Sequence, residues 1–257
     1  MIIYINSGTS PNGINDLRVW DQRQMKIIKP ESNLGYTNNN IKTLDENGEI
    51  TENPIIEVNL IQQIRNKVIE ALENSKDSNG NSRFTVIGKT HTDKVSGTDG
   101  LAYRVNFYNM TSDNKLAECF LGLYLNQGDG KANGLSIITN KTITNKEKFM
   151  ALHIKTQLID KVGLKDNGVN VNLNHPLLSR LKVPSVLVFI GFIDNDSDTL
   201  ILRDRQTEIA DAITLGMENF MDNKYKYITA ELKEYEIKMK TYPEYFTPEM
   251  LQEWAEL

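Results

Sequence analysis

The sequence is poor in the residues on which disulfide-bonded and many metal-binding proteins depend. Its 257 residues include one cysteine, Cys119, and three histidines. A single cysteine excludes an intramolecular disulfide and a cysteine-based zinc site, and a chain of this length can bury a sizeable core without either. HExxH, GxSxG, P-loop and GxGxxG motifs are all missing, so the chain carries no signature of a zincin, a serine hydrolase or a nucleotide-binding protein.

Basic charge and long apolar runs are also scarce. Lysine and arginine number 29 against 34 acidic residues, which leaves a net charge of -5 and argues against a nucleic-acid partner. The longest apolar run, residues 186–193, is too short to cross a bilayer, and the first residues do not resemble a signal peptide. We therefore expect no nucleic-acid partner, no membrane partner and no cofactor. We expect a protein that stays in the cytoplasm until lysis or travels as part of a virion or similar particle.

Short apolar runs alternate with helical patterns along most of the chain. This alternation predicts an α/β fold with a single, mostly parallel, twisted sheet and helices on both faces. Ligands of such sheets bind at the carboxyl ends of the strands. The expected strands lie at residues 2–5, 83–88, 117–125, 134–139 and 183–193, and the expected helices at 55–72, 145–164 and 205–221.

Two segments depart from this alternation. Residues 14–54 show no sustained period, which predicts a long insertion loop in a domain that covers residues 1–221. Residues 222–257 form a charged, aromatic-rich C-terminal extension. It is either a helix that packs back on the domain or an arm that docks a partner, because tyrosine and tryptophan are favoured anchors at interfaces. The anchors would be Tyr242, Tyr245, Phe246 and Trp254.

The acidic run "DNDSD" at residues 194–198 follows the strongest expected strand. It resembles half of a calcium loop but lacks the glycine and the glutamate that such a loop needs. We interpret it as a solvated turn.

Several segments, taken in order, resemble the zinc-dependent N-acetylmuramoyl-L-alanine amidases of the Amidase_3 type. The closest is "VPSVLVFIGFIDNDSDTLILRDRQTEIADAITLGMENF" at 183–220, which is similar to the last strand, turn and closing helix of that family. Weaker matches in the same order are "IYINSGTSPNG" (3–13), "IIEVNL" (55–60), "FLGLYLN" (120–126) and "NGV" (167–169). The resemblance spans residues 1 to about 221 and implies an amidase or zinc-exopeptidase-like fold.

The same resemblance implies where the family's chemistry would lie. Its two zinc-binding histidines fall at Thr9 and Tyr124, its zinc-binding glutamate at Ile55 and its catalytic glutamate at Phe189. Catalytic zinc needs three protein ligands of the usual types, and the reaction needs a carboxylate near the activated water. We therefore expect no metal at these degenerate positions and interpret the chain as a pseudo-amidase that is not an enzyme.

The function expected on this basis is that of a structural or interaction component, in a setting such as a bacteriophage tail or baseplate or a phage-derived particle of a Gram-positive host. Its partners would be other proteins of the assembly, bound through the 14–54 loop and the C-terminal extension. One alternative is a peptidoglycan-binding module that does not cut, with a groove at the strand ends. A second is an amidase with a relocated active site, and a third is a regulator that pairs with an active amidase. The groove would use Asn6, Asn12, Asn126 and Asn195, and the relocated site would use His91, His153, His175 or Asp194.

Overall fold

The structure is a computed structural model. It describes residues 1–7, 19–21, 26–28, 36–87, 117–139, 145–172, 175 and 177–222. The predictions for Thr9, Asn12, His91 and the C-terminal extension lie outside these residues.

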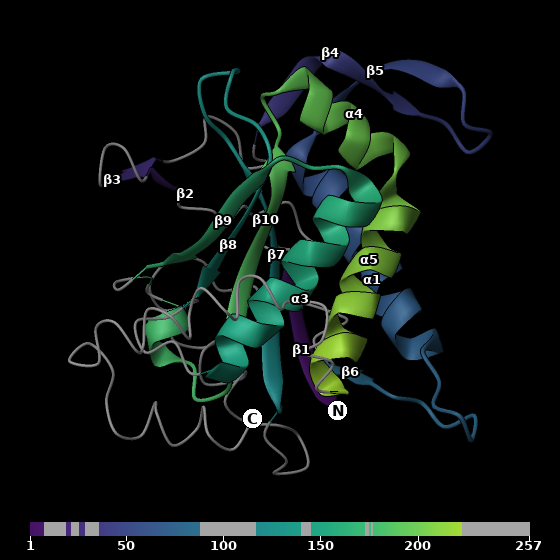
Figure 1. Ribbon diagram of the computed structural model, residues 1–257. Coiled ribbons are helices and arrows are strands. Elements are labelled where there is room, and N and C mark those ends of the chain that lie inside the picture. The colour runs from purple at the N-terminus through teal and green to yellow at the C-terminus, as the bar shows by residue number, and fades with distance from the viewer. Residues whose placement is uncertain are drawn as a thin grey trace.

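A six-stranded sheet in the order β6-β1-β7-β10-β8-β9 forms the centre of the molecule (Figure 1). Four strands, β6, β1, β7 and β10, run parallel, while β8 is antiparallel to β10 and parallel to β9. The mostly parallel sheet expected from the sequence is therefore confirmed. The strands are β1 (Ile2–Ser7), β6 (Thr85–Ile87), β7 (Cys119–Asn126), β8 (Leu135–Thr139), β9 (Asp166–Val171) and β10 (Ser185–Phe192).

Three long helices cover one face of this sheet (Figure 1). They are α1 (Glu57–Asn74), α3 (Asn145–Val162) and α5 (Gln206–Met221). Their apolar stripes pack on the alternate strand residues Ile3, Leu121 and Val188 in the main core. Helices α3 and α5 approach closely because position 216 is glycine: a Cβ there would lie 2.7 Å from the Cα of Ile154.

The opposite face of the sheet carries a second, aromatic core. Tyr4, Phe120, Tyr124 and Leu187 point to this side, since successive side chains of a strand alternate between faces. Among the described residues, Leu178 of the short 3-10 helix η1 (Leu178–Arg180) and the preceding Leu177 pack in this cluster.

Part of the expected 14–54 loop is ordered into strands. Strands β4 (Thr37–Leu44) and β5 (Ile50–Ile56) form an antiparallel hairpin that leads directly into α1, and β2 (Val19–Asp21) pairs with β3 (Lys26–Ile28). The sequence predicts a loop here because the strand TNNNIKTL is mostly polar and shows no apolar alternation.

The acidic run after β10 is a helix rather than a solvated turn. Helix α4 (Asp196–Asp204) begins there, and the Asn195 side chain caps it by accepting a hydrogen bond from the Asp198 N–H. This cap explains the difference, because an Asx residue two or three positions before a free N–H starts a helix as readily as it makes a turn. None of the described helices combines the length and hydropathy that a bilayer crossing requires.

Candidate functional site

The candidate site lies at the carboxyl edge of the sheet, where β1, β7 and β10 end together. Asp194, which follows β10, binds the loop that follows β7. Its carboxylate accepts hydrogen bonds from the N–H of Gly128, at 2.9 Å, and from the N–H of Gly130, also at 2.9 Å. The two loops that a parallel sheet brings together at this edge are thus tied by one carboxylate.

Asp198 ties the end of β10 to the turn that precedes β8 at the same edge. This residue is 4% exposed, and its Oδ2 accepts hydrogen bonds from the N–H of Phe192, at 2.9 Å, and of Gly134, at 2.8 Å. Burial raises the pKa of Asp198, while the two N–H donors act in the opposite direction. Gly134 has a φ of +100°, and a Cβ there would meet the carbonyl oxygen of Lys165, so only glycine fits beside the carboxylate.

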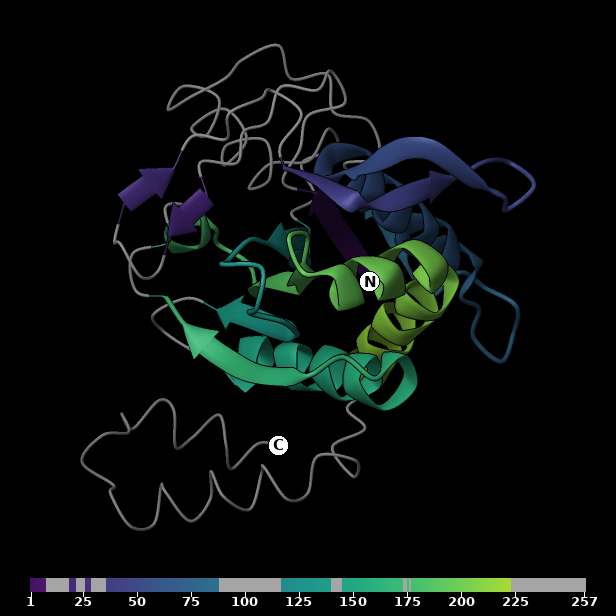
Figure 2. The ribbon, with the colours of Figure 1, turned by 90° about the horizontal axis from the view of Figure 1, so that it is seen from above.

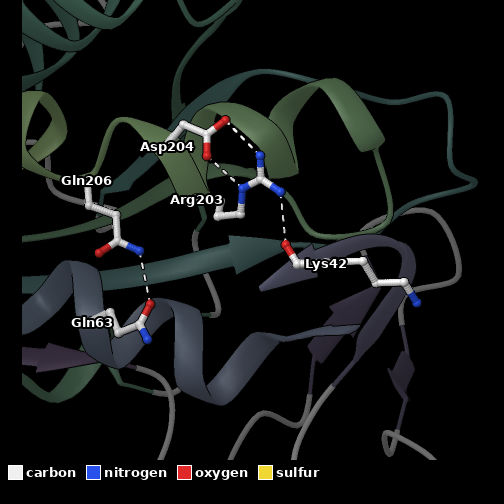
Figure 3. Close-up of polar contacts among 5 residues, drawn as sticks. All are labelled: Lys42, Gln63, Arg203, Asp204 and Gln206. Atoms are coloured by element: carbon white, nitrogen blue, oxygen red, sulfur yellow. Dashed lines mark hydrogen bonds and ion pairs between the residues drawn. The ribbon is translucent and has the colours of Figure 1, made fainter. Parts of the chain in front are cut away.

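The β4–β5 hairpin is anchored to this edge by a buried amide. The Asn38 side chain donates to the carbonyl oxygen of Ile193 at 3.0 Å, to Asp196 Oδ1 at 3.0 Å and to Thr199 Oγ1 at 3.3 Å. Its own Oδ1 accepts from the N–H of Asn40 at 2.9 Å. A second anchor comes from α4, whose Arg203 donates through Nη1 to the carbonyl oxygen of Lys42 at 2.9 Å (Figure 3).

Glu57 begins α1 at the base of the hairpin and is 1% exposed. Its Oε2 accepts the N–H of Tyr36 at 3.0 Å, and its own N–H donates to the carbonyl oxygen of Tyr36 at 2.9 Å. Burial raises the pKa of Glu57 to about 7, and the hydrogen bond from Tyr36 lowers it by a smaller amount. At this burial the side chain holds the hairpin to the helix and does not reach a substrate.

Tyr124 and Phe189 come together on the aromatic face of the sheet. They are register partners on β7 and β10, and their ring centroids lie 5.3 Å apart with an interplanar angle of 31°. Such tilted pairs stabilise beyond the area they bury, by about 0.5–1.5 kcal/mol. Two of the four positions that the resemblance singles out are therefore neighbours in the structure.

Ile55 does not join this pair. It is 3% exposed and packs in the main core on the helical side of the sheet. Ile55 offers no lone pair and Tyr124 offers a single phenolic oxygen, so the residues at the described family positions do not supply the set of ligands that a catalytic zinc ion needs. Within the described ranges, no group of three or more His, Cys, Asp or Glu side chains is arranged to hold a metal.

The other sequence candidates lie apart from one another. His153 is 1% exposed within α3, and burial lowers its pKa to about 4. His175 lies beside η1, where its Nδ1 accepts the N–H of Leu177 at 3.3 Å, and burial lowers its pKa to about 4 as well.

The predicted groove asparagines that the structure describes are engaged within the fold. Asn126 Nδ2 donates to Ser136 Oγ at 3.3 Å, and Asn195 Nδ2 donates to the carbonyl oxygen of Gly130 at 3.3 Å. For Asn6 the structure describes only the backbone, in register with Gly122. The groove therefore stays a prediction.

Sequence reasoning missed three polar residues that build this edge, Asn38, Glu57 and Asp198. Only two of them carry a local signal. An acid in the first turn of a helix is typical of positions such as Glu57, and the spacing of Asn195 and Asp198 matches an N-cap followed by an acidic third residue. No local signal marks Asn38 as an anchor, because the acceptors of its Nδ2 group lie more than 150 positions away in the sequence.

The chain has a twisted, mostly parallel sheet with a polar carboxyl edge. This places it in the class of open α/β folds, whose ligands bind at this edge. Comparison with known families identifies the particular family to which the chain belongs. The model of the family N-acetylmuramoyl-L-alanine amidase (Amidase_3) matches residues 38–219, which is more than half of the chain, and the chain belongs to that family.

Solved structures agree on the fold. An N-acetylmuramoyl-L-alanine amidase from Clostridium difficile 630 is 19% identical with a TM-score of 0.59, and the match covers 87% of this chain and 97% of that one. The CwlD amidase from Clostridioides difficile, in complex with the GerS lipoprotein, is 18% identical with a TM-score of 0.59 and coverage of 86% and 98%. The catalytic domain of the CD27L endolysin targeting Clostridia difficile is 19% identical with a TM-score of 0.54 and coverage of 85% and 97%. No curated protein sequence matches the chain.

These comparisons contradict the prediction that the chain is a pseudo-amidase and not an enzyme. The family to which it belongs is one of amidases, and the similar structures are amidases. The prediction treated four positions as the whole of the catalytic machinery. The replacements at Ile55, Tyr124 and Phe189 show that these positions do not supply the family's zinc ligands or its catalytic glutamate. They do not exclude catalysis by other residues.

Proposed function

We propose that the chain acts on peptidoglycan as an N-acetylmuramoyl-L-alanine amidase, and breaks the amide bond between muramic acid and the stem peptide. The observation that carries this proposal is the family match over residues 38–219. It is supported by the register of the closing strand, in which Phe189 lies beside Tyr124 where the resemblance aligns them with the family's catalytic glutamate and zinc histidine.

The carboxyl edge of the sheet is where we expect the substrate to lie. Ligands of open α/β sheets bind outside the carboxyl ends of the strands, and this edge carries the amides of Asn126 and Asn195 and the carboxylate of Asp194. Amide and carboxylate groups match the alternating N–H and C=O groups of a stem peptide. Binding there requires the substrate to compete with hydrogen bonds that these side chains already make within the protein.

Because the described family positions hold no zinc ligand, the proposal requires reacting groups at other positions. Of the relocated-site candidates in the described ranges, Asp194 is the best placed, because its carboxylate lies at the carboxyl edge, where it can orient an attacking water. His175 lies at the opposite end of the sheet, because its N–H donates to Asn172, which bonds to Thr139 beside the start of β10. Its Nδ1 already accepts the Leu177 N–H, and burial lowers its pKa to about 4, so the ring is a poor proton acceptor at pH 7. His153 is enclosed in α3 and serves as the matched control.

The test is the digestion of purified Gram-positive peptidoglycan. We expect the protein to release stem peptides with a free N-terminal L-alanine, detected by mass spectrometry and by the increase in free amino groups. Asp194→Asn keeps the shape of the side chain but removes the carboxylate, and should abolish release, while His153→Gln should retain it. No release by the wild-type protein would refute the amidase proposal, and equal release by both variants would refute the role of Asp194.

A role in a protein assembly is the second candidate. It is favoured by a similar amidase, CwlD, which is found in complex with the GerS lipoprotein, and by the similarity to an endolysin domain. We propose that this chain also binds a protein partner, in a phage particle or in a cell that releases it on lysis. Probing purified particles with an antibody against the protein would test this setting. Absence of the protein from particles and from lysates would count against the proposal.

A further inference from the structure

The β4–β5 hairpin is held rigidly at its base. Asn38 and Arg203 fasten it to α4, as described above. Between base and turn, the hydroxyl groups of Thr43 and Thr51 bond across the two strands at 2.6 Å. The hairpin extends away from the central sheet, next to α4, to the periphery of the molecule (Figures 1 and 2).

The turn that closes the hairpin is as well ordered as its base. Asp45 Oδ1 accepts the N–H of Asn47 and the N–H of Glu49, both at 2.9 Å. The Asp45 N–H donates to the carbonyl oxygen of Glu49 at 2.9 Å, and Gly48 takes the positive φ, +83°, that the turn requires. The hairpin tip, residues 44–52, is therefore preorganised, and little conformational entropy remains to be lost when it binds a partner.

The hairpin tip exposes an apolar pair. Leu44 and Ile50 are register partners, so their side chains lie on the same face of the hairpin. Leu44 is 37% exposed and Ile50 is 71% exposed, and they are two of the four large apolar residues that stand exposed in the described ranges. Holding an apolar pair in water on a rigid projection costs solvation free energy, which burial against a partner would recover.

All charged side chains within the hairpin tip, residues 44–52, are acidic. The tip contains the exposed carboxylates Asp45, Glu46, Glu49 and Glu52, and none of them makes an ion pair with any residue of the described ranges. A surface of the same charge, such as an anionic membrane or a second copy of this tip, would be repelled. A basic surface would be attracted and would associate faster.

We propose that the hairpin tip is a docking surface for a protein in which basic side chains surround an apolar recess that receives Leu44 and Ile50. The proposal goes beyond the amidase function and does not depend on it, because the tip lies outside the residues to which that function assigns chemistry or substrate.

A defined probe tests the chemistry of this surface. We use a fluorescent peptide of alternating leucine and lysine, and compare it with peptides of leucine and glutamate and of serine and lysine. Fluorescence anisotropy should show binding of the leucine–lysine peptide that weakens at least tenfold for the double variant Leu44→Ser, Ile50→Ser, and weakens similarly for Glu46→Lys, Glu49→Lys. The two other peptides should bind at least tenfold more weakly to the wild-type protein.

Matched controls separate the tip from the remaining surface. Val171→Ser removes an exposed apolar side chain from β9, Glu70→Lys reverses an exposed charge on α1, and neither should change the affinity by more than twofold. Equal binding by the tip variants, or loss of binding in the controls, would overturn the proposal. Two other results would also overturn it by identifying a different occupant: binding of wild-type protein but not the Leu44, Ile50 variant to phosphatidylglycerol vesicles, or a dimer in sedimentation velocity that this variant abolishes.

Discussion

Replacing Glu57 by glutamine should make the protein more stable at neutral and alkaline pH. Glu57 is 1% exposed, and its carboxyl group accepts the N–H of Tyr36 at 3.0 Å. Burial raises the pKa of Glu57 to about 7 from an ordinary value of 4.5. Glutamine has nearly the same shape, and its carbonyl oxygen can accept the same hydrogen bond, so the substitution removes the ionisation and keeps the contact.

The sign and size of the effect follow from proton linkage. Between pH 4.5 and pH 7 the folded protein keeps a proton on Glu57 that the unfolded chain has lost, so the free energy of unfolding falls as the pH rises through this window. The stabilisation by the protonated Glu57 carboxyl group is complete below pH 4.5 and lost above pH 7. With 1.36 kcal/mol for each pKa unit, the full loss is about 3 kcal/mol. Glu57→Gln should abolish this loss.

Urea unfolding of the wild type and of Glu57→Gln at pH 4.5 and at pH 8 measures the effect. The variant should gain about 3 kcal/mol relative to the wild type between the two pH values, and a comparison across pH cancels any constant effect of the substitution. Glu70→Gln, an exposed residue on the same helix, is the control and should show no such change. A difference between the proteins that does not depend on pH would refute the assigned burial of a titrating carboxyl group.

Other predictions concern packing, anchoring and histidine ionisation. Gly216→Ala should lower the unfolding free energy by about 1–3 kcal/mol, because the new Cβ would meet the backbone of α3 at 2.7 Å; no loss in urea unfolding would contradict this packing. Asn38→Ala should cost about 1–3 kcal/mol and speed hydrogen exchange in β4 and β5, whereas the exposed Asn40→Ala should cost less than about 0.5 kcal/mol; equal effects would show that Asn38 is no anchor. The imidazoles of His153 and His175 should stay neutral down to about pH 5, because burial lowers both pKa values to about 4. An NMR titration measures this, and midpoints near pH 6.5 would be inconsistent with the burial of these side chains.

The central sheet could be predicted from the sequence because its signals are local. The strands β7 and β10 are continuous apolar runs, as parallel strands buried on both faces must be, and the helices α3 and α5 keep an apolar stripe of helical period. The pairing of Tyr124 with Phe189 across these two strands is a finding of the structure and was not predicted from the sequence.

The polar edge could not be predicted because its contacts join distant segments. Asn38 on β4 bonds to Ile193 and Thr199 across more than 150 residues, and no local pattern marks it. The hairpin that it anchors has mostly exposed, polar strands, so its stability comes from these contacts and not from apolar alternation. The start of α4 was different, because Asn195 and Asp198 carried a capping signal that the turn interpretation overlooked.

The most direct test of the proposed function is mass spectrometry of peptidoglycan after incubation with the purified protein. The amidase proposal predicts stem peptides with a free N-terminal L-alanine and glycan strands that have lost those peptides, at levels that rise with protein concentration. Intact peptidoglycan after prolonged incubation, with a known amidase active in the same assay, would contradict it.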